Sequence, residues 1–145
     1  LDLGSEGLLL LTNDGALARR LELPVTGWIR RYRVRVHGRI DEDRLPPLEA
    51  GLTLDGVNYG PIRAKLDRQQ GANAWLAVSL AEGKNREIRK IMDHLGWPVS
   101  RLIRLSFGPF QLGNLPKGEV RAVRPKVLAE QLGEAKPNAR YRRPA

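Results

Sequence analysis

The chain has 145 residues, and its 25 Lys and Arg residues against 16 Asp and Glu residues give a formal net charge of +9 at pH 7. It contains no Cys, which excludes disulfides and Cys-ligated zinc; its two His residues are far apart, and no apolar run is long enough to span a bilayer. We therefore expect a cytosolic protein without a metal, and the Arg-led charge excess favours a nucleic acid over a membrane as its partner.

The N-terminal residues place an acid in a polar turn. Asp2 stands in the sequence Leu-Asp-Leu-Gly-Ser-Glu-Gly, directly before a run of four Leu residues. A turn at the mouth of a buried strand can hold a carboxylate rigidly and accessibly, as a nucleophile requires, although Asp is also an ordinary turn former. The Leu run predicts a buried strand over residues 7–12, and the Asn-Asp-Gly at residues 13–15 predicts the N-cap of a short helix that Pro24 ends.

Strict alternation follows in residues 30–36 and predicts a strand with two different faces. Arg31, Arg33 and Arg35 share one face, while Tyr32 lies with two valines on the other. The arginines either follow an RNA backbone or only solvate an exposed face. The ring of Tyr32 is expected to be at least half buried, which is also the ordinary environment of a core tyrosine.

The remaining elements are short and irregularly spaced. Further strands are expected at residues 52–54, 57–59, 61–66, 74–80, 99–107, 110–112 and 120–123. Helices are expected at residues 42–50, 85–95 and 125–132, with a polar loop over residues 67–73 and a basic, disordered tail over residues 134–145. Clustered strands with helices inserted at irregular intervals predict an α+β fold with a mostly antiparallel mixed sheet.

Cations gather where the strand 74–80 leads into the helix 85–95. The sequence Glu-Gly-Lys-Asn-Arg-Glu-Ile-Arg contains Lys84, Arg86 and Arg89. Backbone N–H groups at a helix N-terminus favour anions, so these side chains suit a phosphate or carboxylate site. A solvated helix face with an Arg89–Asp93 pair is the alternative interpretation.

The strand 99–107 offers a second set of candidates. Alternation puts Leu102 and Arg104 on one face and Ile103 on the other, and a plain buried strand explains the same pattern. Lys84, Arg86 and Arg104 are our candidates for holding phosphates, which contributes affinity but little sequence choice.

Three of these segments resemble, in order, the motifs of the ribosomal RNA pseudouridine synthases of the RsuA/RluB type: the Asp2 segment, the Tyr-x-Val-x-Val at Tyr32, and the Glu-Gly-Lys-Asn-Arg-Glu-Ile-Arg that leads into the helix 85–95. The resemblance implies that Asp2 is the catalytic aspartate, that Arg89 forms a salt bridge to it, and that Tyr32 stacks on the target base and takes part in proton removal. The segment around Leu102 resembles a fourth motif, in which Leu102 or Ile103 packs against the flipped base; Leu102 matches it better.

The resemblance also implies a domain organisation and a reaction. Residues 1–133 are expected to be an N-terminally truncated catalytic domain that lacks an upstream S4-type RNA-binding domain. The expected reaction converts a uridine of ribosomal RNA, 23S rather than 16S, into pseudouridine without a cofactor. The family does not tell us whether the aspartate attacks C1′ or removes the C2′ proton.

Truncation has an expected consequence of its own. We expect the intact protein to be a monomer, and a truncated chain to be inactive and to pair through exposed sheet edges. The alternative to an enzyme is a basic RNA-binding or ribosome-assembly module that performs no chemistry. Both bind RNA in a salt-sensitive way, but a mere binder has no need for Asp2, Tyr32 and Arg89 together.

Overall fold

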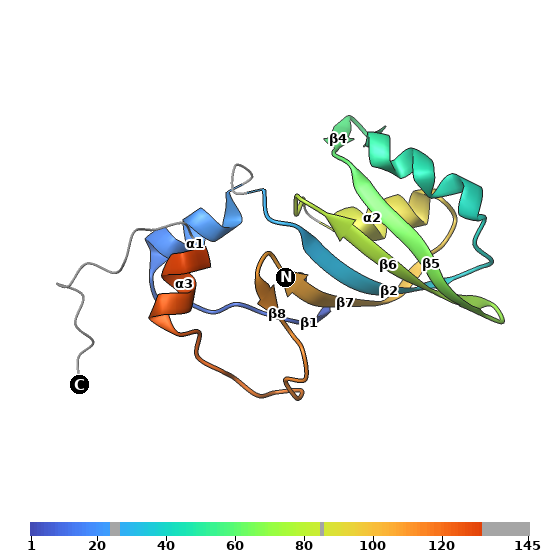
Figure 1. Cartoon of the computed structure of the whole chain (residues 1–145). Helices are drawn as coiled ribbons and strands as arrows, with labels where there is room; N and C mark the ends of the chain where they lie inside the picture. Colours follow the sequence, from blue (N-terminus) through green and yellow to red (C-terminus); the bar gives the residue numbers. More distant parts are fainter. Residues whose placement is uncertain (24–26, 85, 132–145) are drawn as a thin grey trace. The chain divides into compact units, whose positions relative to one another are not determined.

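The structure is a computed structural model that describes residues 1–23, 27–84 and 86–131. The chain divides into two compact units, Leu1–Gly113 and Asn114–Ala145. The second unit contains helix α3 (Pro125–Gln131) in its described part. The first unit carries every other element of the described residues, and Figure 1 labels most of them along the chain.

The strands of the first unit are β1 (Glu6–Gly7), β2 (Arg30–His37), β3 (Leu52–Leu54), β4 (Val57–Tyr59), β5 (Ile62–Gln70), β6 (Asn73–Leu80), β7 (Val99–Phe107) and β8 (Phe110–Gln111). Its helices are α1 (Gly15–Glu22), the 3-10 helices η2 (Glu42–Arg44) and η3 (Pro46–Ala50), and α2 (Glu87–His94). Six strands form one sheet in the order β1-β7-β2-β6-β5, with β8 also paired to β7; β3 and β4 form a separate hairpin. Only β1 pairs in parallel in this sheet, so the expected α+β fold with a mostly antiparallel mixed sheet is confirmed.

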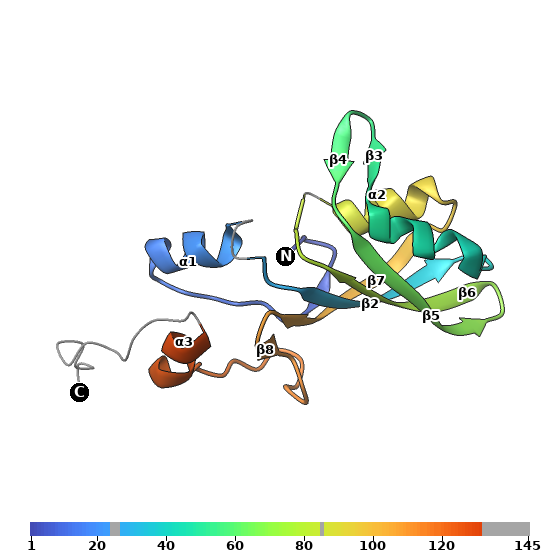
Figure 2. The ribbon, with the colours of Figure 1, turned by 45° about the horizontal axis from the view of Figure 1, so that its top comes forward.

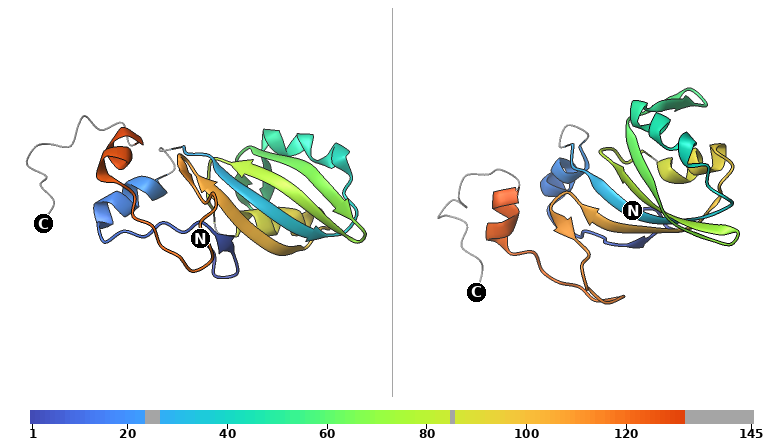
Figure 3. Two further views of the ribbon diagram at one scale, coloured as in Figure 1. Left: turned by 60° about the horizontal axis from the view of Figure 1, so that its bottom comes forward. Right: turned by 45° about the vertical axis from the view of Figure 1, so that its right-hand side comes forward.

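The two faces of the sheet have opposite character because side chains alternate along each strand. Val34 and Leu76 are fully buried on one face, and Ile91 and Met92 of α2 pack with them in the same core. Figure 2 shows α2 and the two 3-10 helices on this face. The left view of Figure 3 looks onto the opposite side of the sheet, with β7, β2, β6 and β5 in front of those helices.

Local signals in the sequence account for several element boundaries. The carboxylate of Asp14 accepts hydrogen bonds from the N–H groups of Ala16 and Leu17, so it caps α1 as predicted. Asp41 caps η2 in the same way, and the predicted helix 42–50 is two 3-10 turns interrupted before Pro46. Asp55 and Gly56 both have positive φ, which suits the tight turn of the β3–β4 hairpin.

Three expectations about elements are wrong. The Leu run forms no long buried strand: β1 has two residues, and Leu9 and Leu11 are 55% and 76% exposed. An apolar run becomes a strand only where a neighbouring strand supplies backbone hydrogen-bond partners. The N–H of Leu8 donates to the Arg104 carbonyl oxygen, but residues 9–11 do not extend the pairing with β7. Residues 120–123 form no strand either.

The third error concerns the predicted loop 67–73. Strand β5 continues to Gln70 through a bulge between Leu66 and Arg68, and β6 begins at Asn73. The amide of Gln69 donates to the carbonyl oxygens of Gly71 and Asn73, so a polar side chain closes a tight turn there. The predicted helix stop at Pro24, the end of the last helix at residue 132 and the tail 134–145 lie outside the described residues.

Candidate active site

A cavity of about 390 Å³ opens on the helix-bearing face of the first unit. Four segments far apart in sequence meet there: the N-terminal turn, β2, the connection from β6 to α2, and β7. The lining includes Asp2, Ser5, Arg30, Tyr32, Glu82, Lys84, Arg86, Glu87, Leu102, Arg104 and Phe107. Six of the eight residues singled out from the sequence therefore border one space: Asp2, Tyr32, Lys84, Arg86, Leu102 and Arg104.

The turn that carries Asp2 is held from two sides. Within the turn, the N–H of Ser5 donates to the Asp2 carbonyl oxygen at 3.0 Å. From α2, Nη2 of Arg89 donates to the carbonyl oxygen of Gly4 at 2.8 Å. The Arg89 guanidinium thus binds the backbone of the turn, and the structure has no ion pair between it and the Asp2 carboxylate.

Tyr32 lies between the catalytic candidate and a pair of arginines. Burial raises the pKa of its phenol, while the positive charges of Arg104 and Arg30 act in the opposite direction and the charge of Asp2 adds to the increase. The ring is therefore uncharged in the resting cavity. Burial also lowers the pKa of Arg30, although not enough to remove its charge.

The two arginines are fixed by one aromatic ring. The guanidinium carbons of Arg30 and Arg104 lie 4.7 and 5.1 Å from the centre of the Phe107 ring. Nε of Arg104 also donates to the carbonyl oxygen of Leu8 at 2.9 Å, so a buried cation ties β7 to the chain that follows β1. The ring and this hydrogen bond thus hold two guanidinium groups in place at the cavity.

The structure separates the two apolar candidates of β7. Leu102 is 5% exposed and lines the cavity. Ile103 points to the other face of the sheet, where its register partners are Arg33 and Glu6. The expectation that Ile103 contributes to the same pocket is therefore not met, because successive residues of a strand face opposite ways.

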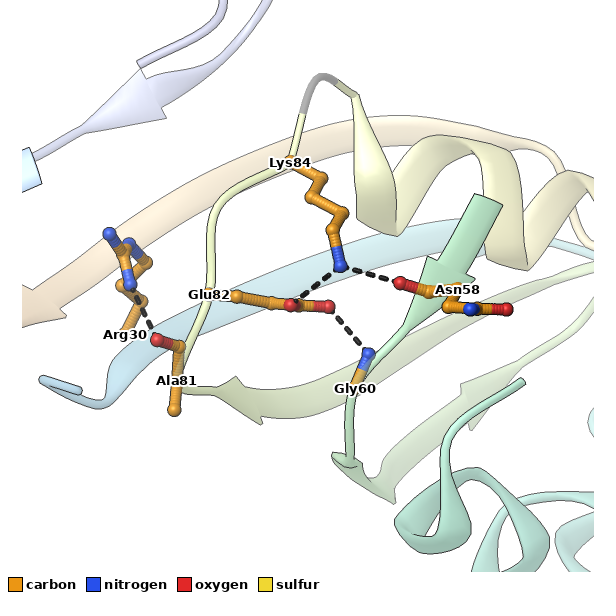
Figure 4. Close-up of polar contacts among 6 residues, drawn as sticks. All are labelled: Arg30, Asn58, Gly60, Ala81, Glu82 and Lys84. Carbon is orange, nitrogen blue, oxygen red and sulfur yellow. Dashed lines mark hydrogen bonds and ion pairs between the residues drawn. The ribbon is translucent and has the colours of Figure 1, made fainter. Parts of the chain in front are cut away.

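The connection from β6 to α2 compensates part of its own charge. Figure 4 shows the ammonium of Lys84 between the carboxylate of Glu82, at 2.9 Å, and the carbonyl oxygen of Asn58. The other Glu82 oxygen accepts from the N–H of Gly60 at 2.6 Å. Burial would raise the pKa of Glu82, but these hydrogen bonds outweigh it and lower the pKa. Lys84 therefore stabilises the loop. Its ammonium is already paired with Glu82, so it is less available to a phosphate than the sequence predicts.

Glu87 is a site residue that the sequence interpretation missed. It is 3% exposed, and neither of its carboxyl oxygens has a hydrogen-bond partner among the described residues. Burial, followed by the charge of Glu82, raises its pKa to about 8. The residue before it, Arg86, adopts a left-handed conformation with φ of 51°, which costs energy for a side chain other than Gly or Asn. Strain and a buried acid thus coincide at the cavity.

Sequence signals for the missed residues exist but are weak. Arg30 lies two residues before Tyr32 and therefore shares its face, and Glu87 lies four residues before the buried Ile91. Neither signal distinguishes a cavity from the core.

In the described parts of the chain, no group of three or more His, Asp or Glu residues is placed to hold a metal ion, and no helix combines the length and apolar character needed to cross a bilayer.

Comparison with known proteins adds independent information. Residues 1–94 match the family model described as RNA pseudouridylate synthase. An uncharacterized RNA pseudouridine synthase of Rickettsia bellii is 49% identical over 130 residues, which are 88% of this chain and 55% of the relative. The ribosomal large subunit pseudouridine synthase B of Yersinia pestis is 44% identical over 121 residues, 81% of this chain and 36% of the relative.

Solved structures agree with the sequence matches. A crystal structure of a pseudouridylate synthase superposes with a TM-score of 0.76 and 27% identity, over 91% of this chain and 56% of the other. The chain thus spans about half the length of the first relatives it matches.

Proposed function

The chain belongs to the RNA pseudouridylate synthase family, and from this membership we propose that it isomerises a uridine of ribosomal RNA to pseudouridine, with Asp2 as the catalytic aspartate. The observation that best supports the proposal is the convergence of Asp2, Tyr32 and Leu102 on one cavity from three distant segments. A binder that performs no chemistry does not require this convergence.

The proposed reaction is an isomerisation with no net oxidation or reduction. The bond between N1 and C1′ breaks, the uracil turns, a bond forms between C5 and C1′, C5 loses a proton and N1 gains one. In our proposal the Asp2 carboxylate acts on the ribose, either by attacking C1′ or by removing the C2′ proton. Its place in a turn held by the hydrogen bond from Arg89 to Gly4 supports this role, because a fixed carboxylate loses little entropy on reaction.

Arg89 enters the proposal as the residue that positions the turn. Its bond to Gly4 keeps a positive charge beside the turn that carries Asp2. The bond therefore fixes the turn relative to α2, which supports a positioning role for Arg89. A direct salt bridge from Arg89 to Asp2 stays a prediction.

Tyr32 and Leu102 would hold the base. A uridine in folded RNA must leave its stack to enter a cavity, and a half-buried phenol with an apolar neighbour provides a stacking surface for it. The raised pKa of Tyr32 keeps the phenol protonated at rest, so Tyr32 can take the C5 proton only after its own proton has left to solvent. Arg104 and Arg30 would stabilise the phenolate formed in between.

Cations at the rim would bind the flanking phosphates. Arg86 is exposed beside the cavity, and Arg104 is buried in its wall. The name of the Yersinia pestis relative favours the large ribosomal subunit, hence 23S RNA, as the substrate. No metal or cofactor is part of the proposal, since the isomerisation needs no electron carrier.

Pseudouridine mapping of ribosomal RNA tests the proposal. The substitutions are made in the protein as its gene encodes it, in cells that lack the wild-type copy. Asp2→Asn is expected to abolish one pseudouridine that the wild-type copy restores, while RNA binding is retained. Asp93→Asn removes the same charge at an exposed position of α2 and serves as the matched control. A pseudouridine that persists with Asp2→Asn would refute the catalytic assignment.

A further inference from the structure

The sheet has a second chemically distinctive surface, on the side away from the cavity. Strand β2 carries Tyr32 toward the cavity and Arg31, Arg33 and Arg35 toward the opposite side. The register of the neighbouring strands adds cations to the same side. Together they form what we call the cationic sheet face: Arg31, Arg33, Arg35, Arg63, Lys65, Arg68 and Arg101, around Trp75, Ala77 and Ser79.

These residues form rows across the strands. Arg35 pairs with Arg101 on one side and with Trp75 on the other, and Arg68 follows Trp75. In the next row Ala77 separates Arg33 from Lys65. Because neighbouring strands lie about 4.8 Å apart and alternate residues about 7 Å apart, the cations make a two-dimensional array.

Most of this charge is uncompensated within the described residues. Glu6 forms a two-pronged ion pair with Arg101, at 2.8 and 2.9 Å. Glu49 lies 3.4 Å from Arg63. The remaining five cations have no acid within ion-pair distance in the described parts of the chain. Like charges beside each other across strands destabilise a sheet, so folding alone does not account for the array.

An indole holds several of the arginines in place. The guanidinium carbon of Arg33 lies 4.4 Å from the centre of the Trp75 ring, and those of Arg101 and Arg35 lie at 5.7 and 5.8 Å. Stacking on an aromatic ring orients a guanidinium but leaves N–H groups free to donate outward. The centre of the face, at Ala77, is exposed and has no bulky side chain. The surface therefore presents many hydrogen-bond donors around an open centre.

We propose that the cationic sheet face binds the phosphate backbone of a second segment of the substrate RNA, away from the nucleotide that enters the cavity. The proposal rests on the proposed function only in taking ribosomal RNA as the substrate. Charge complementarity selects the occupant: planar guanidinium forks match phosphate oxygens, and contacts to phosphates bind RNA without reading its sequence. The spacing of the arginines along β2 is comparable with that of successive phosphates along a nucleic-acid strand.

The first test changes only the charge at the centre of the face. Ala77→Glu introduces an acid among the cations, and Ala77→Gln is its neutral counterpart of the same size; neither removes a contact of the wild-type face. Affinity for protein-free 23S RNA made by transcription is measured by filter binding with the protein as its gene encodes it. We expect Ala77→Glu to bind roughly three- to tenfold more weakly than Ala77→Gln at low salt, with the difference vanishing at high salt.

The second test removes cations. The triple substitution Arg31→Gln, Arg33→Gln and Arg35→Gln is compared with Arg39→Gln, Lys90→Gln and Lys126→Gln, which removes three exposed charges elsewhere. Loss of three phosphate contacts should weaken binding roughly ten- to a hundredfold at low salt and reduce the slope of log affinity against log salt by about 2. The rate at saturating RNA should be unchanged, because the cavity is untouched.

The outcomes separate this proposal from the proposed function. Two results overturn the proposal that this face binds RNA. One is an equal loss of affinity in both triple variants. The other is wild-type affinity in both Ala77→Glu and the variant without Arg31, Arg33 and Arg35, which is expected if an acidic protein occupies the face instead. A wild-type protein that forms no pseudouridine, yet binds 23S RNA through this face, refutes the proposed function and supports the surface. Thermal unfolding checks that each variant is folded. If the triple variant does not fold, the comparison of Ala77→Glu with Ala77→Gln tests the proposal by itself.

Discussion

Glu87 combines deep burial with a neighbouring acid, Glu82. A carboxyl group in such surroundings keeps its proton well above its ordinary range, and its pKa is raised to about 8 from 4.5. At neutral pH Glu87 is therefore protonated, while its neighbour Glu82 is ionised. A protonated carboxyl group can donate a hydrogen bond to a ligand as well as accept one.

Glu87→Gln should change how stability depends on pH. In the wild-type protein the folded state retains a proton on Glu87 between pH 4.5 and about 8 that the unfolded chain releases. The free energy of unfolding therefore falls as the pH rises through this window. Gln is neutral throughout, so the variant should gain stability relative to the wild type between pH 5 and 8, on the order of 2 kcal/mol. Urea unfolding at both pH values measures the difference.

Glu82 has the opposite direction of pKa shift and is one cause of the raised pKa of Glu87, so the comparison reports on the interacting pair. A difference in stability between variant and wild type that is the same at pH 5 and pH 8 would contradict a raised pKa. Glu49→Gln, at an exposed acid outside the cavity, is the control and should show no such trend.

Much of the site was predictable residue by residue. Alternation correctly put Tyr32 and the arginines of β2 on opposite faces, and the N-terminal turn, β2, the start of α2 and β7, which were all singled out from the sequence, each contribute residues to the cavity lining. Arg30 and Glu87 were not recognised, because a buried charge has no distinct local pattern. The hydrogen bond from Arg89 to Gly4 joins residues 85 positions apart, which no local pattern contains.

At the scale of elements, β1 is short but positions the Asp2 turn. Gly7 has a φ of +98°, and a Cβ atom there would collide with the carbonyl oxygen of Arg104 in the paired strand β7. Only Gly allows this close approach of two backbones. The approach brings the turn to the mouth of the cavity.

Gly7→Ala is expected to destabilise the protein by more than about 1 kcal/mol and to lower the rate of pseudouridine formation, because the turn must move away from β7. Gly15→Ala is the matched control. Gly15 is the first residue of α1, and a Cβ atom added there would meet nothing within 4 Å, so this change should be neutral or stabilising by up to about 1 kcal/mol. Chemical denaturation measures both, and equal effects of the two changes would disprove the close-approach argument.

Helices were more predictable than the edges of the sheet. Helix α1 has its cap in its own sequence, and α2 has buried residues at helical spacing, so each is specified locally. The two-residue strand β1 and the extension of β5 to Gln70 depend instead on what lies beside them. The Leu run illustrates the difference, since its composition favours a strand but its ladder ends after Leu8.

At the scale of the whole molecule, the proposed RNA substrate would meet positive charge on two surfaces. Part of the net charge of +9 lies on both sides of the sheet, at the rim of the cavity and on the cationic sheet face. Two cationic surfaces back to back suit a large, folded RNA better than a short strand. Binding on both releases counterions from the RNA.

We therefore expect affinity for protein-free 23S RNA to fall at least about tenfold when salt is raised from about 50 to about 200 mM, and an uncharged osmolyte at equal osmolarity to have little effect. Filter binding over a salt series measures the slope. Affinity that is insensitive to salt would show that apolar contacts dominate and would argue against both cationic surfaces.

The sequence by itself determined the fold class, the caps of α1 and η2, the two-faced character of β2 and the segments that border the cavity, because each depends on neighbouring residues and their period. Only the tertiary structure decided that Leu102 rather than Ile103 borders the cavity, that Glu87 is buried there and that Arg89 holds the Gly4 carbonyl. The array around Trp75 likewise requires four strands in one register. Register between distant strands is set by the packing of the whole sheet, so no single segment contains it.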